Sequence, residues 1–172
     1  MDGRSAAVVI FGLLACCLAT AQEMGAPNRE RYKLRENSHI GGLLLGTEIG
    51  NAVWVLPFDK PYAALTKDQQ TMVRSQYEQM SESDEPPYPI DGLGSIYDPV
   101  ARAQQRLLVK GQFYAMVEVD AIGQPTAVAI HRTPSAKVSK FVAAIILATK
   151  FKPALCDGTP CSMGFPVRVE FQ

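Results

Sequence analysis

Two cysteines near the end of the chain are the residues best placed for chemistry, since Cys156 and Cys161 enclose only the four residues Asp-Gly-Thr-Pro. A zinc site needs four ligands, and the two histidines of the chain, His39 and His131, lie far away in the sequence. The C-x4-C spacing also differs from the C-x-x-C motif of thiol oxidoreductases. We therefore expect a structural disulfide between Cys156 and Cys161, which stabilises the fold by roughly 2 kcal/mol and fixes the start of the final strand.

Other side chains with catalytic potential lack the partners that catalysis needs. Glu82, Asp84 and Glu85 form an acidic cluster, but the segment is rich in proline and reads as a solvated turn. His131 has no evident serine or cysteine partner, and the glycine-rich segment 41–46 lacks the Lys-Ser/Thr of a phosphate-binding loop. We expect no enzymatic activity, no cofactor and no metal.

The composition describes a globular protein with balanced charge. The chain has 172 residues, of which 47% are hydrophobic and 20% charged, and its 17 Lys and Arg residues equal its 17 Asp and Glu residues. This length suits a single domain with some additional sequence. Because a nucleic-acid binder usually carries a basic excess, we expect no nucleic-acid partner.

The first 21 residues have the layout of a secretory signal peptide. Arg4 precedes an apolar run over 6–18, and small residues at 19 and 21 predict cleavage before Gln22. The run is short for a membrane-spanning helix, which needs about 20 apolar residues. The segment therefore predicts export from the cytoplasm.

Two alternatives for this leader remain open, an uncleaved membrane anchor and a lipoprotein signal ending at Cys16. Cleavage before Gln22 removes Cys16 and Cys17 and leaves one even pair of cysteines for an oxidising compartment, whereas lipidation of Cys16 leaves Cys17 unpaired. The cysteine count thus favours the cleaved form. We expect contact with a membrane only if the leader is retained or Cys16 is lipidated.

Residues 22–85 form an N-terminal extension that contains one clear helix. The pattern predicts this helix over 66–80, opened by a capping box of Thr66 and Gln69. Upstream, residues 52–58 are typical of a short strand. The proline- and acid-rich segment 81–94 interrupts structure, and we place a domain boundary at its middle, after residue 85.

Downstream of this boundary, a second helix is predicted from Asp98 to Lys110. Asp98 suits the N-cap, Pro99 suits the first helical position, and Gly111 ends the helix. Residues 112–132 then form a hairpin, with a turn at 121–124 in which Gly123 can adopt a positive φ. One face of its first strand is apolar, formed by Phe113, Ala115, Val117 and Val119.

A third helix and a last strand complete the sequence pattern. Ser135 can cap the helix, and Pro153 stops it. Its apolar stripe consists of Val138, Phe141, Val142, Ile145 and Ile146. The alternation over 165–171 predicts a half-buried strand. The order β-β-α-β indicates an α+β fold, a small antiparallel sheet with helices packed on one face.

The segment 86–172 resembles the TonB C-terminal domain family, a domain of energy transducers. Its members have a Gly-led strand ending in V-D-x-x-G, a second strand, a helix, F-x-P-A, a G-x-P turn and a V-x-V-x-F strand. The matching residues are Gly111, Val119, Asp120, Gly123, Phe151, Pro153, Ala154, Gly158, Pro160, Val167, Val169 and Phe171. The Tyr-Pro at 88–89 is also similar to the start of that domain. The chain differs at 133–135, where the family has two serines and a glycine, and it lacks the proline-rich spacer of TonB.

The resemblance implies protein binding in the periplasm of a Gram-negative bacterium. In the family, the last strand is an open edge to which a peptide of an outer-membrane receptor adds as a further strand, a step of TonB-dependent transport. The resemblance assigns partner contacts to Tyr88, Pro89, Val167, Arg168, Val169, Glu170 and Phe171. The alternative is an envelope scaffold that forms a homodimer through the same strand, without energy transduction.

Overall fold

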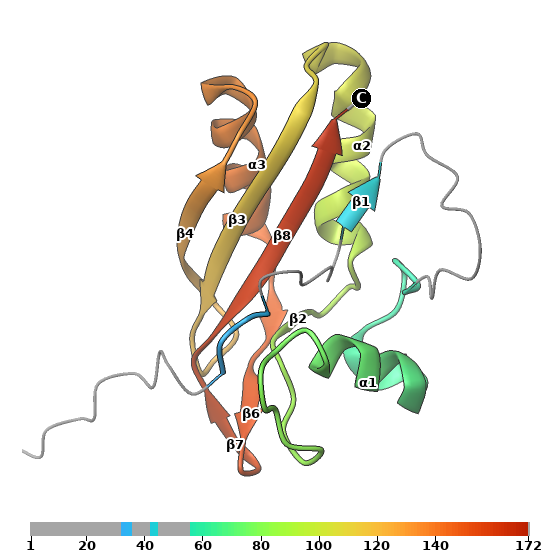
Figure 1. Ribbon diagram of the computed structural model, residues 1–172, viewed down its shortest axis with the longest axis vertical. Helices are drawn as coiled ribbons and strands as arrows, with labels where there is room; N and C mark the ends of the chain where they lie inside the picture. The colour runs from blue at the N-terminus through green and yellow to red at the C-terminus, as the bar shows by residue number, and fades with distance from the viewer. Residues whose placement is uncertain (1–31, 36–41, 45–55, 172) are drawn as a thin grey trace, which may run out of the picture.

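The computed structural model describes residues 32–35, 42–44 and 56–171, and it has a mixed α+β fold (Figure 1). The main sheet has the strand order β1-β8-β3-β4. Its strands are β1 (Gly42–Leu44), β3 (Gly111–Val119), β4 (Pro125–Arg132) and β8 (Met163–Phe171). The helices are η1 (Tyr62–Ala64), α1 (Lys67–Arg74), α2 (Gly94–Leu107) and α3 (Ala136–Ala148).

The predicted hairpin and final strand are confirmed. β3 pairs antiparallel with β4 on one side and with β8 on the other. The alternation of the sequence determines which side chains enter the core, because successive residues of a strand point to opposite faces. Phe113, Ala115, Val117 and Val119 of β3 and Phe165, Val167, Val169 and Phe171 of β8 are all buried. The antiparallel β-β-α-β unit is therefore present, although the four-stranded sheet is mixed because β1 is parallel to β8.

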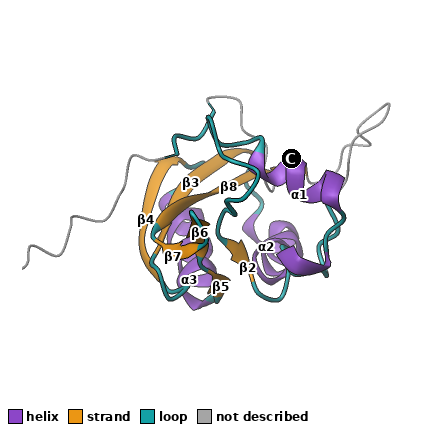
Figure 2. Ribbon diagram, turned by 90° about the horizontal axis from the view of Figure 1, so that it is seen from below, coloured by secondary structure: helices purple, strands orange, loops and turns teal. Residues whose placement is uncertain are grey.

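Helices α2 and α3 cover one face of this sheet (Figure 2). The hydroxyl of Ser135 accepts a hydrogen bond from the amide of Val138, which confirms the predicted cap of α3. Val138, Val142 and Ile146 are fully buried beneath the sheet, whereas the other two residues of the predicted stripe are partly buried. The helix ends at Ala148, before the predicted stop at Pro153, because Thr149 already adopts an extended backbone.

The predicted start of α2 is wrong. The helix begins at Gly94, so Pro99 lies inside it and Asp98 is not its N-cap. The apolar stripe explains the difference, because it extends upstream of Pro99 and its burial outweighs the missing amide hydrogen of one proline. The stripe comprises Leu93, Ile96, Tyr97 and Val100, all fully buried. The helix also ends earlier than predicted, at Leu107, and Leu108 follows it in the left-handed conformation.

Helix α1 has the predicted capping box at Thr66 and Gln69, but it ends at Arg74 and not at residue 80. After this point, the backbone forms hydrogen bonds with residues that are distant in the sequence. The amide of Glu78 donates to the carbonyl of Lys33 at 2.7 Å, and Leu34 forms a β-bridge with Tyr77. We call residues 32–35 the arm. Its pairing with residues 77 and 78 takes the place of the helical hydrogen bonds that were predicted up to residue 80.

The segment before residue 86 shares the core of the sheet. Tyr62, Leu65, Val73 and Tyr77 lie in the same buried cluster as the residues of β3 and β8. Two short antiparallel pairs extend this end of the molecule. They are β2 (Tyr88–Pro89) with β5 (Phe151–Lys152), and β6 (Ala154–Cys156) with β7 (Thr159–Cys161).

Motif residues of the resemblance have structural roles in the β3–β4 turn. The carboxylate of Asp120 accepts the amides of Ile122 at 3.0 Å and Gln124 at 2.8 Å. Gly123 has φ +82°, as predicted, and its carbonyl accepts the amide of Phe151 at 3.0 Å. The turn is thus attached to the strand that follows α3.

Several sequence predictions lie outside the described residues. These are the leader at 1–21, its cleavage site and most of the strand predicted over 52–58, of which 56–58 form no strand. Among the described residues, no helix is both long and apolar enough to cross a membrane.

Candidate functional site

The predicted partner-binding strand lies in the sheet as β8 (Figure 1). The side chains of Val167, Val169 and Phe171 are buried toward the helices, so they belong to the core. Arg168 and Glu170 alternate with them and are half-buried on the opposite face. A partner that adds to β8 would therefore pair with its backbone, and the alternating side chains on the open face would provide selectivity.

The expectation that β8 is an open edge is wrong over Arg168–Glu170. Strand β1 lies beside it and pairs in parallel, with Gly42 opposite Arg168, Leu43 opposite Val169 and Leu44 opposite Glu170. In a parallel pair, a residue bonds to the two residues that flank its partner. The register thus directs the backbone groups of Leu43 to Arg168 and Glu170.

Only part of the outer side of β8 can pair with another strand. Every second residue of β8 directs its N–H and C=O away from β3. Pro166 belongs to this outward set, since it pairs with Met116 of β3 and has no N–H to donate. The carbonyl of Gly164, two residues earlier, already accepts a hydrogen bond from the Tyr77 hydroxyl at 2.9 Å. The Arg168 amide bonds to the Tyr97 hydroxyl, so the outward amide that an added strand can use is that of Glu170. We call the outward backbone groups of Arg168 and Glu170 the docking rim.

A row of side chains crosses the open face of the sheet next to the docking rim. The Arg168 guanidinium lies 4.4 Å from the centre of the Tyr114 ring, a cation–π contact. The Tyr114 ring in turn stacks on His131, with centroids 5.1 Å apart. Contacts across three neighbouring strands hold the Arg168 side chain over β3. His131 is exposed and part of this stack.

The other edge of the sheet is less suited to strand addition. β4 begins with a proline, and its pairing with β3 shifts register twice, between Tyr114 and Ala115 and between Glu118 and Val119. Such irregularities twist an edge and disrupt its row of donors and acceptors. The sheet thus favours the β8 side for a docking partner.

Tyr88 and Pro89 lie in β2 and are both buried. The Tyr88 ring packs edge-on against Phe165 of β8 at 6.4 Å and against Tyr62 at 5.8 Å. This burial argues against direct contact of the two side chains with a partner. Their place in the structure is the core below β8.

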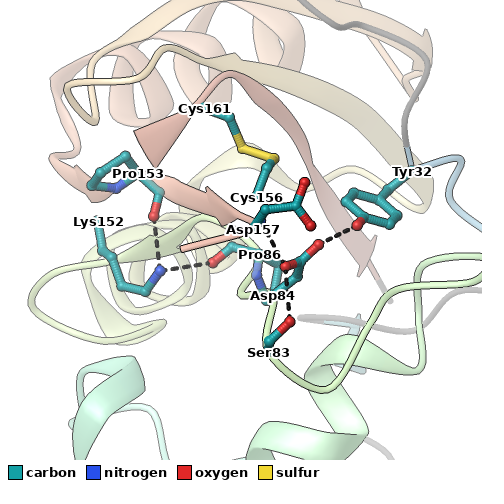
Figure 3. The surroundings of a disulfide bond; sticks show 9 residues. All are labelled: Tyr32, Ser83, Asp84, Pro86, Lys152, Pro153, Cys156, Asp157 and Cys161. Atoms are coloured by element: carbon teal, nitrogen blue, oxygen red, sulfur yellow. Dashed lines mark hydrogen bonds between the residues drawn. A yellow bond between two sulfur atoms is a disulfide. The ribbon is translucent and has the colours of Figure 1, made fainter. Parts of the chain in front are cut away.

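The predicted disulfide is confirmed. Cys156 and Cys161 are joined, with their Cα atoms 5.9 Å apart, and they close the β6–β7 hairpin that leads into β8 (Figure 3). Next to this hairpin lies Asp84, whose side chain is completely buried. Its carboxylate accepts the amide of Asp157 at 2.9 Å, the hydroxyl of Ser83 at 3.3 Å and the hydroxyl of Tyr32. Asp84 therefore connects the arm to the disulfide-closed hairpin.

The acidic cluster of the sequence is divided among separate roles. Glu82 is exposed, Asp84 is buried at the hairpin, and Glu85 forms an ion pair with Lys152 at 3.0 Å. Burial lowers the pKa of Lys152, while Glu85 partly opposes this shift. The Lys152 ammonium also donates to the carbonyls of Pro86 at 3.3 Å and Pro153 at 2.8 Å. These contacts hold the lysine in a structural position.

No group of three or more His, Cys, Asp or Glu residues able to hold a metal occurs within 32–35, 42–44 and 56–171. A hollow with a volume of about 460 Å³ is lined by residues of α2 and the preceding loops, among them Phe58, Asp59, Asp98 and Arg102. No residue of β8 belongs to its lining.

Comparison with known proteins gives no relative. No family model matches the chain, and neither the curated proteins nor the solved structures contain a significant match.

Sequence reasoning missed three features that limit pairing along β8: the neighbouring strand β1, the missing amide of Pro166 and the hydrogen bond from Tyr77. Pro166 carried a usable signal, because a proline within an alternating strand implies that its nitrogen faces away from the neighbouring strand. The pairing of Gly42–Leu44 with β8 carried none, since three residues are too few for a periodic pattern.

Proposed function

We propose that this chain is an exported protein-binding module. It takes up an extended segment of an envelope protein, such as a receptor of the outer membrane, along the docking rim of β8. The observation that carries the proposal is that the outer side of this nine-residue strand accepts a short neighbouring strand, β1, at Arg168–Glu170. A strand that can accept one short neighbour can accept another segment in its place. The resemblance to the TonB C-terminal domain supports this type of partner and a place in TonB-dependent transport.

A partner binds by backbone hydrogen bonds to a short part of β8. The Arg168 carbonyl and the Glu170 amide are the outward groups that pair, whereas Pro166 and the Tyr77–Gly164 hydrogen bond prevent pairing further upstream. A pairing region of this length fits a peptide motif of a few residues. Each backbone hydrogen bond contributes about 1 kcal/mol net, so the side chains of the partner must supply most of the affinity.

A proline substitution on the docking rim tests the proposal. Glu170→Pro removes an outward amide but leaves the ladder to β3 intact, because that ladder uses the residues on either side, Val169 and Phe171. Glu170→Ala is the matched control, since it removes the same side chain and keeps the amide. Titration of the secreted chain with peptides from the N-termini of outer-membrane receptors should show at least about tenfold weaker binding for Glu170→Pro only.

Equal capture by wild type and Glu170→Pro would contradict strand addition. Capture by none of the three proteins would contradict a receptor partner. Light scattering on the same samples addresses the alternative function: a stable dimer that Glu170→Pro dissociates would indicate an envelope scaffold joined through β8. Sequencing the N-terminus of the secreted protein should give Gln22 if the export prediction is right.

A further inference from the structure

We propose that β1 is an internal pseudo-ligand, which occupies the docking rim until a partner displaces it. The inference rests on the proposed function and adds a regulatory step to it. In this view, the chain is autoinhibited, and the affinity measured for a partner is reduced by the fraction of molecules in which β1 is bound.

The first argument is that β1 and an added strand need the same backbone groups. The register places Leu43 between Arg168 and Glu170, where its N–H can bond to the Arg168 carbonyl and its C=O can accept the Glu170 amide. These two residues are the docking rim. A partner therefore cannot pair there while β1 remains in place.

The second argument is that no neighbouring site on β8 is available to a partner as a substitute. Upstream, Pro166 offers no amide, and the Gly164 carbonyl already bonds to Tyr77, which is itself fully buried. The Tyr77 backbone is held by the arm through its bridge with Leu34. Displacement of β1 is thus the route by which a segment reaches this strand.

The pairing also describes the partner that would replace β1. It runs parallel to β8, as β1 does, and places one residue opposite Val169, between Arg168 and Glu170. We therefore infer a partner strand that pairs in parallel with this part of β8.

Amide exchange in the full secreted chain tests whether β1 occupies the docking rim. Leu43→Pro removes the central amide of β1, and Leu43→Ala is the matched control that keeps it. The Glu170 amide should exchange about tenfold faster in Leu43→Pro than in the other two proteins. The amide of Val117, in the centre of the sheet, should remain equally protected in all three and so report an intact fold.

The second measurement uses a fluorescent peptide with the sequence of residues 38–48, SHIGGLLLGTE, as the probe. Leu43→Pro should bind this peptide at least about tenfold more tightly than wild type and Leu43→Ala, because its docking rim is vacated. Equal affinity of the three proteins, or equal exchange of their Glu170 amides, would overturn the inference. Protection of Glu170 that rises with protein concentration would also overturn it, because β1 would then come from a second copy.

The two proposals fail in different ways. If the probe binds Leu43→Pro but no receptor peptide does, the internal pseudo-ligand stands and the proposed function falls. If receptor peptides bind wild type and Leu43→Pro equally, the docking rim binds partners without displacement of β1, and only the present inference falls.

Discussion

The hydrogen bond between Tyr32 and Asp84 should stabilise the fold by coupling the arm to the disulfide-closed hairpin. Asp84 is 0% exposed, and its carboxylate accepts the hydroxyl of Tyr32 and the amide of Asp157. A hydrogen bond to a charged group contributes about 1.5–3 kcal/mol. Because Tyr32 is only half-buried, we expect Tyr32→Phe to cost about 1 kcal/mol. Asp84→Asn preserves the shape but weakens every bond to this side chain, so we expect a loss of about 2 kcal/mol.

A double-mutant cycle measures this coupling directly. Urea denaturation of wild type, Tyr32→Phe, Asp84→Asn and the double variant should give an interaction free energy of about 1 kcal/mol. Ser83→Ala is a useful control, since its hydroxyl also donates to Asp84 but comes from the adjacent residue and connects no distant segment. If the costs of the two substitutions add to within about 0.3 kcal/mol, Tyr32 and Asp84 do not act together and the arm is not held by this carboxylate.

Three further predictions concern stability. Gly123→Ala should cost at least about 2 kcal/mol, because its Cβ would lie 2.0 Å from the Phe151 carbonyl oxygen at a positive φ; the control Gly158→Ala, with no atom within 4 Å, should cost only the backbone strain of about 1 kcal/mol. Replacing Cys156 and Cys161 together by alanine should lower the free energy of unfolding by roughly 2 kcal/mol, and reduction of the wild type should match it in urea titrations. Burial raises the pKa of three core tyrosines above the ordinary value of 10.0, so these groups ionise first in the unfolded chain. Their contribution to the free energy of unfolding is complete below pH 10. Above that pH, it falls by up to about 1.4 kcal/mol per group and pH unit. The absorbance of three of the six tyrosinates should therefore rise only with alkaline unfolding, and ionisation of more than three tyrosines well before unfolding would contradict the burial of Tyr77, Tyr88 and Tyr97.

The parts of the fold that could be predicted are those in which a local pattern and the tertiary structure agree. The strand over 111–119 alternates from Phe113 to its end, and the turn that follows contains both Asp120 and Gly123. The cap at Ser135 and the capping box at Thr66 are likewise local, since donor and acceptor lie three residues apart. Such elements can be predicted from their own residues, because their formation does not depend on distant contacts.

The predictions that failed depended on competition with distant residues. The Asp98-Pro99 pair is a typical helix start, but the burial of Leu93, Ile96 and Tyr97 extends α2 upstream of it. The neighbours of the docking rim were missed for the same reason. β1 and Tyr77 contact β8 from positions about 90–130 residues earlier in the chain, so no local pattern predicts these contacts.

The small size of β1 determines how the docking rim can discriminate between partners. Three residues supply only a few hydrogen bonds of about 1 kcal/mol each, and the entropy lost on ordering the segment offsets much of this gain. We expect a net margin near 1.4 kcal/mol, which corresponds to a tenfold competition with any partner. A partner restricted to the same window forms equivalent backbone bonds, so the backbone alone cannot favour it. Its advantage must come from side chains on the open face, where Arg168 is held over Tyr114. Selectivity therefore depends on that face, and Tyr114→Ala should reduce discrimination between peptides more than it reduces occupancy by β1.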